Sequence, residues 1–228
     1  MRIALDGPCG AGKSTLGRLL AQRLGYVYID TGAMYRAVAL CALESGVSLD
    51  DPAALEALAG NLRMEFKPCG ERQKLFVEKW DVTDAIRSPR VSQGASRVSA
   101  IPGVRRAMVK LQREMSADTD VVMDGRDIGT VVFPDAEVKF YLDAAVEERA
   151  QRRWAEDRGR GLDADYDEIL REIRERDHRD MHRSDSPLRR AEDAVPIDSS
   201  GLGVEDVLGR MLDHVSRVIV GKRRAGKP

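Results

Sequence analysis

Near the amino terminus, the octapeptide from Gly7 to Ser14 reads Gly-Pro-Cys-Gly-Ala-Gly-Lys-Ser. It matches the phosphate-binding pattern G-x-x-x-x-G-K-[ST] at every position. In such a loop, backbone N–H groups face phosphate oxygens, the lysine reaches the outer phosphates, and the hydroxyl residue holds Mg²⁺. We therefore predict a nucleoside triphosphate site with Lys13 on the phosphates and Ser14 on the metal. The alternative is a glycine-rich turn that matches by chance.

The segments on either side of this loop have the patterns that such a site requires. Ile3-Ala4-Leu5 is a short apolar run typical of a buried strand, and leucines recur at helical spacing from Lys13 to Leu24. A strand, a glycine loop and a helix N-terminus together direct the helix dipole and unpaired amides at one anion. The residues predicted to bind the triphosphate are Gly7, Pro8, Cys9, Gly10, Ala11, Gly12, Lys13, Ser14 and Thr15.

A second cluster of charged residues, Asp124-Gly125-Arg126-Asp127, follows the apolar run Val121-Val122-Met123. An aspartate at the end of a strand beyond such a loop is placed to hold Mg²⁺ or its waters. An arginine two residues later can bind a phosphate through its planar fork. We predict these functions for Asp124 and Arg126; the alternative for Asp124 alone is a solvated strand end.

A third candidate segment runs from Asp30 to Arg36, directly after the apolar run Tyr26-Val27-Tyr28-Ile29. Thr31 is predicted to cap the following helix, because threonine is favoured at N-caps. Arg36 is predicted to project from the first turns of that helix towards an anion.

A fourth candidate segment is spaced along a predicted helix near residue 180. Arg176, Asp180 and Arg183 are separated by four and three residues, so we expect them on one face of this helix. The alternative is an exposed helix covered by salt bridges. His178 and His182 are also four residues apart, which leaves open a metal site, although nucleotide contacts explain the helix better.

The pattern of apolar runs predicts an α/β fold with a doubly wound parallel sheet. Helical patterns separate most of the runs, and each run ends at an aspartate. Pro196 places the last run near a sheet edge. Gly159-Arg160-Gly161 is predicted to break a helix. The five runs are Ile3–Leu5, Tyr26–Ile29, Val121–Met123, Val138–Leu142 and Ala194–Ile197, and their aspartates are Asp6, Asp30, Asp124, Asp143 and Asp198.

The region from Gly60 to Arg87 has short alternating runs instead, and they predict a small antiparallel insertion. Its runs are Met64–Phe66, Leu75–Val77 and Trp80–Val82, which are split by Pro68–Glu71 and by Glu78-Lys79. Helices are expected from Pro89 to Ala100 and from Pro102 to about Met115.

Composition narrows the class of protein. A chain of 228 residues suits one α/β domain with an insertion, and a formal net charge of −1 provides no basic field for a nucleic acid polymer. Three cysteines without metal-ligand spacing favour a reducing compartment. No apolar run approaches the length of a membrane span, and the start shows no secretion signal, so we expect a cytoplasmic enzyme without membrane contact.

On these motifs the chain resembles the bacterial cytidylate kinases, which are nucleoside-monophosphate kinases. The resemblance extends from Ile3 to about Val218 and is most specific at Asp124–Ala136. It implies transfer of the γ-phosphoryl group of ATP to CMP or dCMP in pyrimidine nucleotide metabolism, with Mg²⁺. It also implies a three-layer P-loop NTPase fold with sheet order 2-3-1-4-5. The motifs that carry it are Gly7–Thr15, Asp30–Arg36, Asp124–Ala136 and Glu175–Asp180.

The resemblance also implies residue roles and boundaries. The lid would contribute Arg149, Arg152, Arg153 and Arg158, although a solvated face is an equal alternative for one of them. We expect a monomer with a single kinase domain over 1–228, a CMP-binding subdomain at about 34–118, a β insertion at about 61–87, a lid at about 151–166 and a basic tail at 221–228. CMP would be bound by Thr31, Arg36, Ser96, Arg105, Arg126, Asp127, Arg176, Asp180 and Arg183, and the catalytic groups would be Lys13, Arg126, Arg152, Arg153 and Arg158.

Two positions depart from the family pattern, since Cys9 and Thr31 stand where serine is more common. Cys9 is interpreted as a small spacer, with a thiolate activated by the helix N-terminus as the alternative. Asp127 is predicted to accept a hydrogen bond from the cytosine amino group and so to reject uracil, which presents an acceptor there. Two other functions stay open: a kinase for adenylate, uridylate or shikimate, and a nucleotide-binding module without turnover.

Overall fold

The structure is a computed structural model that describes residues 1–69 and 72–225. The chain forms two compact units. The first contains Met1–Tyr28 and Thr119–Pro228, and the second contains Ile29–Asp118. The predicted CMP-binding subdomain, about 34–118, falls within the second unit, and the phosphate-binding loop belongs to the first.

Five strands form one sheet in the order β2-β6-β1-β7-β8. Numbered within this sheet alone, the order is 2-3-1-4-5, as predicted. β1 is central and pairs in parallel with β6 and β7, and β8 pairs in parallel with β7. Pro196 lies in β8 at the edge of the sheet, where a residue without an N–H is tolerated. The strands are β1 (Arg2–Asp6), β2 (Val27–Asp30), β6 (Val121–Gly125), β7 (Val138–Asp143) and β8 (Val195–Asp198).

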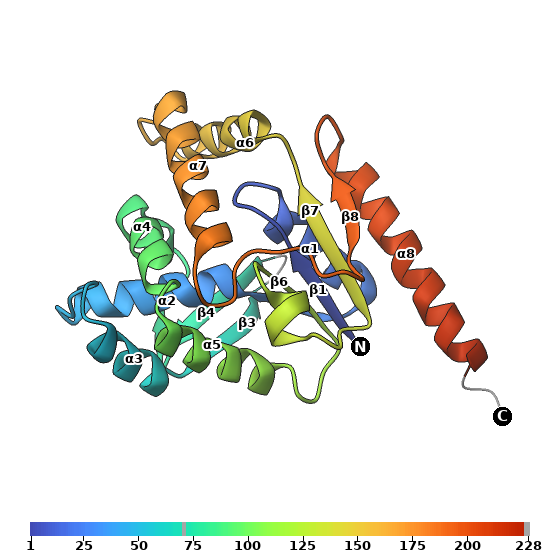
Figure 1. Ribbon diagram of the computed structural model, residues 1–228, viewed down its shortest axis with the longest axis horizontal. Coiled ribbons are helices and arrows are strands. Elements are labelled where there is room, and N and C mark those ends of the chain that lie inside the picture. The colour runs from blue at the N-terminus through green and yellow to red at the C-terminus, as the bar shows by residue number, and fades with distance from the viewer. Residues whose placement is uncertain (70–71, 226–228) are drawn as a thin grey trace. The chain divides into compact units, whose positions relative to one another are not determined.

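Helices α1 (Lys13–Leu24) and α8 (Val204–Ala225) pack their apolar sides against this sheet, as Figure 1 shows for α8 beside β8. The bounds of α1 are those predicted, and α1 ends because Gly25 adopts a left-handed conformation with φ 70°. The core between them includes Ile3, Leu5, Leu16, Leu20, Val122, Phe140, Leu142, Val207, Leu208, Met211 and Val215.

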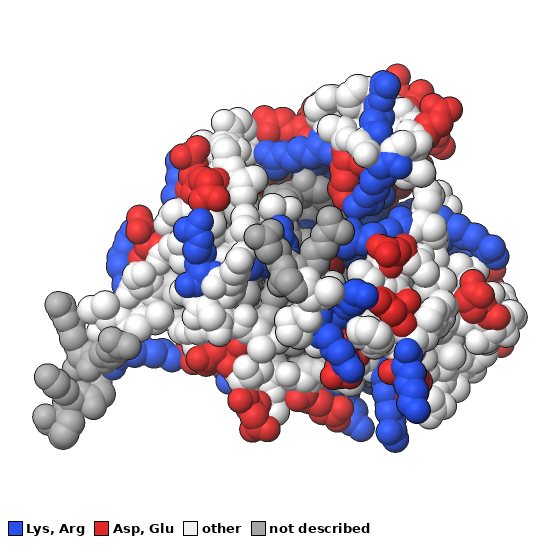
Figure 2. Space-filling model, turned by 180° about the vertical axis from the view of Figure 1, so that it is seen from behind, with Lys and Arg blue, Asp and Glu red and all other residues white. Residues whose placement is uncertain are grey.

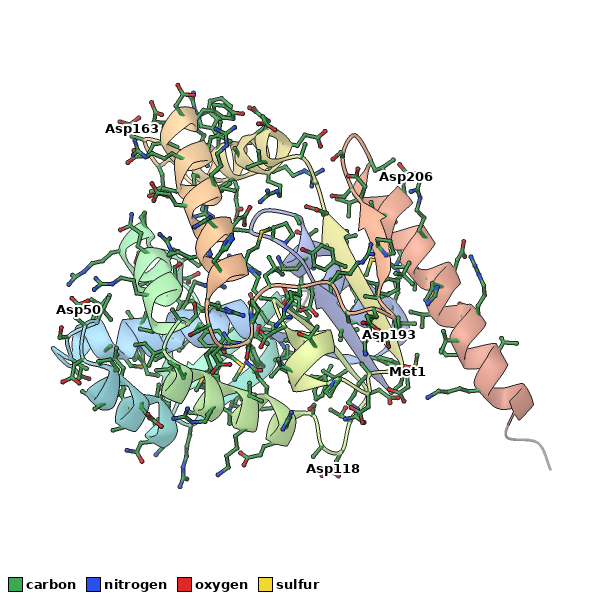
Figure 3. The ribbon with its side chains drawn as sticks, in the orientation of Figure 1. Met1, Asp50, Asp118, Asp163, Asp193 and Asp206 are labelled. Carbon is green, nitrogen blue, oxygen red and sulfur yellow. The ribbon has the colours of Figure 1, made fainter. Side chains whose placement is uncertain are left out.

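Helices α6 (Val146–Gly159) and α7 (Tyr166–His182) lie side by side in the first unit (Figure 1). Ala150 of α6 packs against Ile169 and Ile173 of α7. The predicted break at Gly159-Arg160-Gly161 is confirmed, and Asp163 lies in the turn that follows it (Figure 3). The range expected to form a lid, about 151–166, covers the end of α6, this turn and the first residue of α7.

The second unit combines helices with the predicted antiparallel insertion, which is confirmed as a sheet in the order β3-β4-β5. Of the four residues that split the first two runs, Pro68 and Cys69 belong to β3, and Gly70 and Glu71 lie outside the described residues. Proline is tolerated in β3 because it is an edge strand. The elements are α2 (Thr31–Glu44), α3 (Pro52–Asn61), β3 (Met64–Cys69), β4 (Arg72–Val77), β5 (Trp80–Asp81), η1 (Ala85–Arg87), α4 (Pro89–Val98) and α5 (Pro102–Met115).

The cap predicted for Thr31 is wrong. Asp30 is the N-cap of α2: it has an extended backbone, and its carboxylate accepts the N–H of Ala33 at 2.7 Å. Thr31 is the first residue of the helix itself. Aspartate and threonine both serve as N-caps, so the side chain that reaches the third helical amide decides between them, and here that is Asp30.

Two further elements differ from the sequence analysis. A five-residue π-helix, η2 (Ile128–Val132), follows β6 and was not predicted. The predicted tail at 221–228 is helical over its first five residues, since α8 continues to Ala225, and residues 226–228 lie outside the described residues.

The surface is charged but mixed. On the face drawn in Figure 2, acidic and basic side chains are interspersed, in keeping with a net charge of −1. Over residues 1–69 and 72–225, we find no helix that is long and apolar enough to cross a membrane.

Candidate active site

The phosphate-binding loop joins β1 to α1 and depends on its glycines. Gly7, Gly10 and Gly12 have φ angles of 150°, 78° and 89°, in the range that favours glycine. A Cβ on Gly7 would lie 1.9 Å from the carbonyl oxygen of Leu142 in β7, so a larger residue cannot fit. Gly12 is the N-cap of α1 and has no side chain to accept the first amides of the helix. These amides are therefore left for an anion.

Lys13 is the buried cation of this loop, with only 6% of its surface exposed. Its Nζ donates to the carbonyl oxygen of Pro8 at 2.6 Å. Burial, and then the nearby Arg126 cation, lower the pKa of Lys13 to about 7. A polyanion bound in the loop would favour the charged form of Lys13, so this site is suited to phosphate.

Ser14 and Asp124, the two predicted metal ligands, are brought together although 110 residues separate them. The Ser14 hydroxyl donates to Asp124 Oδ2 at 3.0 Å, and the Tyr28 hydroxyl donates to Asp124 Oδ1 at 2.8 Å. Hydroxyl and carboxylate oxygens are the hard donors that Mg²⁺ prefers, so the pair fits that ion. Tyr28 was not predicted, because a tyrosine in an apolar strand carries no signal of this contact.

Four predicted CMP-binding residues, Arg126, Asp127, Asp180 and Arg183, form one charged group that we call the Arg126 cluster. Arg126 Nε donates to Asp180 Oδ2 at 2.9 Å. Arg183 Nη2 lies 3.5 Å from Asp127 Oδ1, and Arg183 Nη1 lies 4.0 Å from Asp180 Oδ1. The side chains of Asp127, Asp180 and Arg183 are each 7% exposed. Because these charges are shielded from water, removing one of them would leave its partner buried without compensation, which is costly.

Arg183 reaches this cluster in a different way from the one predicted. Helix α7 ends at His182, and Arg183 is its C-cap with extended backbone angles. The expectation that Arg176, Asp180 and Arg183 share one helix face is therefore wrong for Arg183. The chain turns at the helix end, and Arg183 Nε then donates to the carbonyl oxygen of Ser186 at 2.6 Å.

Arg126, Arg176 and Lys13 place positive charge close to the loop. Desolvation raises the pKa of Asp180, but Arg126 and Arg176 lower it more strongly, so it lies below its ordinary value. Desolvation also raises the pKa of the Cys9 thiol, whereas Arg176, Arg126 and Lys13 bring it below its ordinary value. Three cations thus act on the residue in the middle of the loop, and such a field favours a bound anion.

Asp6 holds the segment that directly follows Asp127. This buried residue ends β1, and its carboxylate accepts the N–H groups of Ile128 at 2.8 Å and Gly129 at 2.7 Å. Burial raises the pKa of Asp6 to about 6, although the two amides oppose the shift. Asp6 therefore anchors the start of η2 directly after Asp127. The position of Asp6 at a strand end was predicted from the sequence, but its contacts with Ile128 and Gly129 were not.

The arginines expected in the lid lie along α6 and have partners within the first unit. Arg152 Nη2 donates to the carbonyl oxygen of Ser199 at 2.8 Å. Arg153 Nε donates to Asp157 at 2.8 Å, and the Arg158 guanidinium lies 5.1 Å from the centre of the Trp154 ring. Arg149 differs from these three because its side chain is only 7% exposed.

Of the five remaining predicted CMP-binding residues, Arg176 lies on α7 in the first unit, and the other four belong to the second unit. Arg36 Nη2 donates to Asp30 Oδ2 at 3.2 Å, and Thr31 precedes it by five residues on α2. Ser96 is buried on α4. Arg105 is buried on α5 and donates to the carbonyl oxygen of Ser99 at 3.1 Å. Their roles towards CMP stay predictions.

The histidine pair gives no support to the metal alternative. The rings of His178 and His182 stack with centroids 4.1 Å apart. Among the residues that the structure describes, no group of three or more histidine, cysteine, aspartate or glutamate side chains is arranged to hold a metal ion.

Comparison with solved structures agrees with the observed architecture. A gluconokinase from Sinorhizobium meliloti superposes with a TM-score of 0.52 at 14% identity, covering 99% of this chain and 97% of that chain. At this identity the likeness concerns the fold alone.

Comparison of sequences is more specific. A family model described as cytidylate kinase matches residues 3–217. A cytidylate kinase from Carboxydothermus hydrogenoformans is 48% identical and covers 95% of this chain and 98% of its own length. One from Syntrophotalea carbinolica is 50% identical and covers 94% of this chain and 91% of its own length. Because the match extends over nearly the whole chain and includes the loop and the Arg126 cluster, this chain belongs to the cytidylate kinase family.

Proposed function

We propose that this chain transfers the γ-phosphoryl group of ATP to CMP or dCMP, giving ADP and CDP or dCDP, with the donor in the phosphate-binding loop. Membership of the cytidylate kinase family supports the reaction. The observation that carries the assignment is the buried Lys13 in a glycine loop with Arg126 and Arg176 close by. In this proposal Gly7–Thr15 hold the triphosphate, and Arg126 contacts the transferred group.

Magnesium would be held by the Ser14 hydroxyl and the Asp124 carboxylate, whose oxygens fit this ion. When bound, the ion neutralises charge on the phosphates. Tyr28 supports the site because its hydroxyl donates to Asp124 Oδ1, which leaves Asp124 Oδ2 directed at Ser14.

The chemistry requires little from the protein beyond position and charge. The acceptor is a phosphate oxygen that is already ionised near neutral pH, so no general base is needed. Lys13 and Arg126 supply fixed positive charge for the moving phosphoryl group, and Asp180 holds Arg126 in place through its 2.9 Å hydrogen bond. The lid arginines Arg152, Arg153 and Arg158 are proposed to add charge when the nucleotide is bound.

On the acceptor side, we assign the CMP phosphate to Thr31, Arg36 and Arg126. Asp127 accepts a hydrogen bond from the cytosine amino group in this proposal, and Ser96 and Arg105 donate to the ring acceptors. Arg176, Asp180 and Arg183 complete the ribose and phosphate side. The ion pair between Arg183 and Asp127 supports this role, because it holds the Asp127 carboxylate in one place within the cluster.

A substrate panel tests the function directly. The protein is incubated with Mg-ATP and CMP, dCMP, UMP or AMP, and ADP release is followed by a coupled assay, with CDP identified as the product of the CMP reaction. We expect CMP and dCMP to react well and UMP and AMP poorly. If AMP or UMP is the best acceptor, the proposed substrate is wrong; if ATP binds but no acceptor turns over, the chain is a binding module.

A further inference from the structure

One buried ion pair in the first unit takes no part in the proposed function described above. Arg149 of α6 and Asp177 of α7 approach to 2.5 Å between Nη1 and Oδ2. Their side chains are 7% and 10% exposed. Arg149 Nε also donates to the carbonyl oxygen of Ala144 at 2.9 Å, in the connection between β7 and α6. The guanidinium is therefore fixed at both ends.

The same pair binds the phosphate-binding loop through both backbone groups of Cys9. The Cys9 N–H donates to Asp177 Oδ1 at 3.2 Å, and the Cys9 carbonyl oxygen accepts from Arg149 Nη1 at 2.8 Å. Sequence separations of 168 and 140 residues make both contacts tertiary. In Figure 1 the loop that follows β1 lies close to the lower end of α7, in agreement with these distances.

Packing of the loop against α6 is equally close at the next residue. Gly10 has a φ of 78°, and a Cβ there would lie 3.0 Å from Arg149 Cβ and 3.2 Å from the Arg149 carbonyl oxygen. The loop backbone thus lies directly on the first turn of α6 and cannot shift towards it.

These contacts determine how two consecutive peptide groups are oriented. A trans peptide is planar, and its C=O and N–H point in opposite directions. Holding the Cys9 carbonyl at Arg149 therefore turns the Gly10 N–H away from Arg149. Holding the Cys9 N–H at Asp177 likewise turns the Pro8 carbonyl away from Asp177. The oxygen of this carbonyl accepts the hydrogen bond from Lys13 Nζ at 2.6 Å. The ion pair is thus linked to Lys13 through one peptide group.

We propose that Arg149 and Asp177 are positioning residues for the donor nucleotide: they set the orientation of the Pro8–Cys9 and Cys9–Gly10 peptides, and with them the place of Lys13 and of a loop amide. This rests on the proposed function of the loop as the ATP site. Arg149 then acts through the loop backbone, not as one of the arginines that close over the transferred group. The expected defect falls on ATP and spares CMP.

The chain offers a matched control. Glu147 of α6 and Arg174 of α7 form an ion pair at 3.0 Å that joins the same two helices, with both side chains 59% exposed. Asp177→Asn and Glu147→Gln each remove one negative charge from a pair that joins α6 to α7. Only Asp177 contacts the loop.

The experiment measures the Kd for Mg-ATP by calorimetry without acceptor, and then KM for ATP, KM for CMP and kcat. We expect Asp177→Asn to raise the Kd and KM for ATP about 10- to 100-fold, because asparagine is neutral and its single acceptor oxygen cannot serve both Arg149 and the Cys9 N–H. KM for CMP should change by less than about twofold, and Glu147→Gln should change every constant by less than about twofold. Equal effects on ATP and CMP, or an unchanged Kd for ATP in Asp177→Asn, would overturn the proposal.

A double variant separates positioning from stability. Replacing a whole buried ion pair by apolar residues commonly preserves or raises stability. Arg149→Met with Asp177→Leu is therefore expected to melt at or above the temperature of Asp177→Asn while still binding ATP weakly. If it binds ATP like the wild type, the pair is only structural. A wild type that binds ATP but forms no CDP would instead contradict the proposed function and leave the ATP measurement valid.

Discussion

The phosphate-binding loop and the outer surface of α6 and α7 carry the same kinds of charged side chain in opposite surroundings. Around the loop, Lys13, Asp124 and Asp180 are buried and each has a defined partner. On the outer surface, pairs such as Arg174–Glu147 are more than half exposed. Exposed pairs contribute little free energy because water screens them, whereas buried charges are costly unless their partners remain. The number of arginines therefore says less about function than their burial does.

The largest expected effect comes from the buried cation of the loop. Lys13→Met removes the charge but keeps the length of the side chain. We expect kcat to fall by about 10³-fold or more, because a fixed charge on the phosphates is lost. A coupled assay with Mg-ATP and CMP measures it. Lys67→Met, at an exposed residue of β3, is the control and should retain normal kcat; a comparable loss there would erase the contrast between buried and exposed cations.

Removal of the Arg126 side chain should have the next largest effect. Arg126→Ala is expected to reduce kcat/KM by about 10²- to 10³-fold, because Arg126 supplies transition-state charge and donates the 2.9 Å hydrogen bond to Asp180. Steady-state kinetics with both substrates varied measures the loss. Arg171→Ala, whose side chain is 67% exposed on α7, is the matched control with a near-normal rate. A near-normal rate for Arg126→Ala would remove it from the site.

Asp6 is a buried carboxyl that is held by backbone amides and, among the residues that the structure describes, has no cationic partner in a salt bridge, so its stability effect should depend on pH. Its pKa is raised from 3.8 to about 6, so the folded state binds more protons than the unfolded state between these values. The stability that Asp6 contributes is therefore complete below pH 3.8 and is lost as pH rises through about 6, by about 3 kcal/mol.

Denaturant unfolding of the wild type and Asp6→Asn from pH 4 to pH 7 measures this effect. The difference in the free energy of unfolding, wild type minus variant, should decrease as pH rises. Asp81, an exposed carboxyl whose pKa is lowered to about 2 by Lys74 and Thr83, provides the opposite case: its contribution is present above pH 3.8 and is lost as pH falls through about 2. A pH-independent difference for Asp6→Asn would show that Asp6 titrates normally.

The smallest of the expected effects concerns substrate choice. Asp127→Ala should reduce the preference for CMP over UMP in kcat/KM by about 10- to 100-fold, because a buried acceptor distinguishes the cytosine amino group from the uracil oxygen. Rates with both nucleotides at saturating ATP measure the ratio. An unchanged ratio would assign base selection to other residues, such as Arg105 and Ser96.

Much of the fold was predictable because its signals are local. The apolar runs marked all five strands of the parallel sheet, and the loop motif placed α1 at its observed bounds, Lys13–Leu24. Proline and glycine signals correctly placed β8 at an edge and the end of α6. Errors arose where neighbouring residues compete, as between Asp30 and Thr31 for the cap of α2. The π-helix η2 was not predicted, because its residues show no periodic apolar pattern. Its start is held instead by a tertiary contact, in which two backbone amides donate to the buried Asp6 carboxylate.

The sequence by itself determined the phosphate-binding loop, since eight consecutive residues contain the glycines, the lysine and the hydroxyl that the site needs. It also indicated the charged candidates around that loop. Only the tertiary structure decided which of them are paired: Arg126 with Asp180, and Cys9 with Arg149 and Asp177 across 140 and 168 residues. The physical reason is that a local pattern specifies backbone conformation, whereas the strength of a charge depends on burial and on partners brought together by folding.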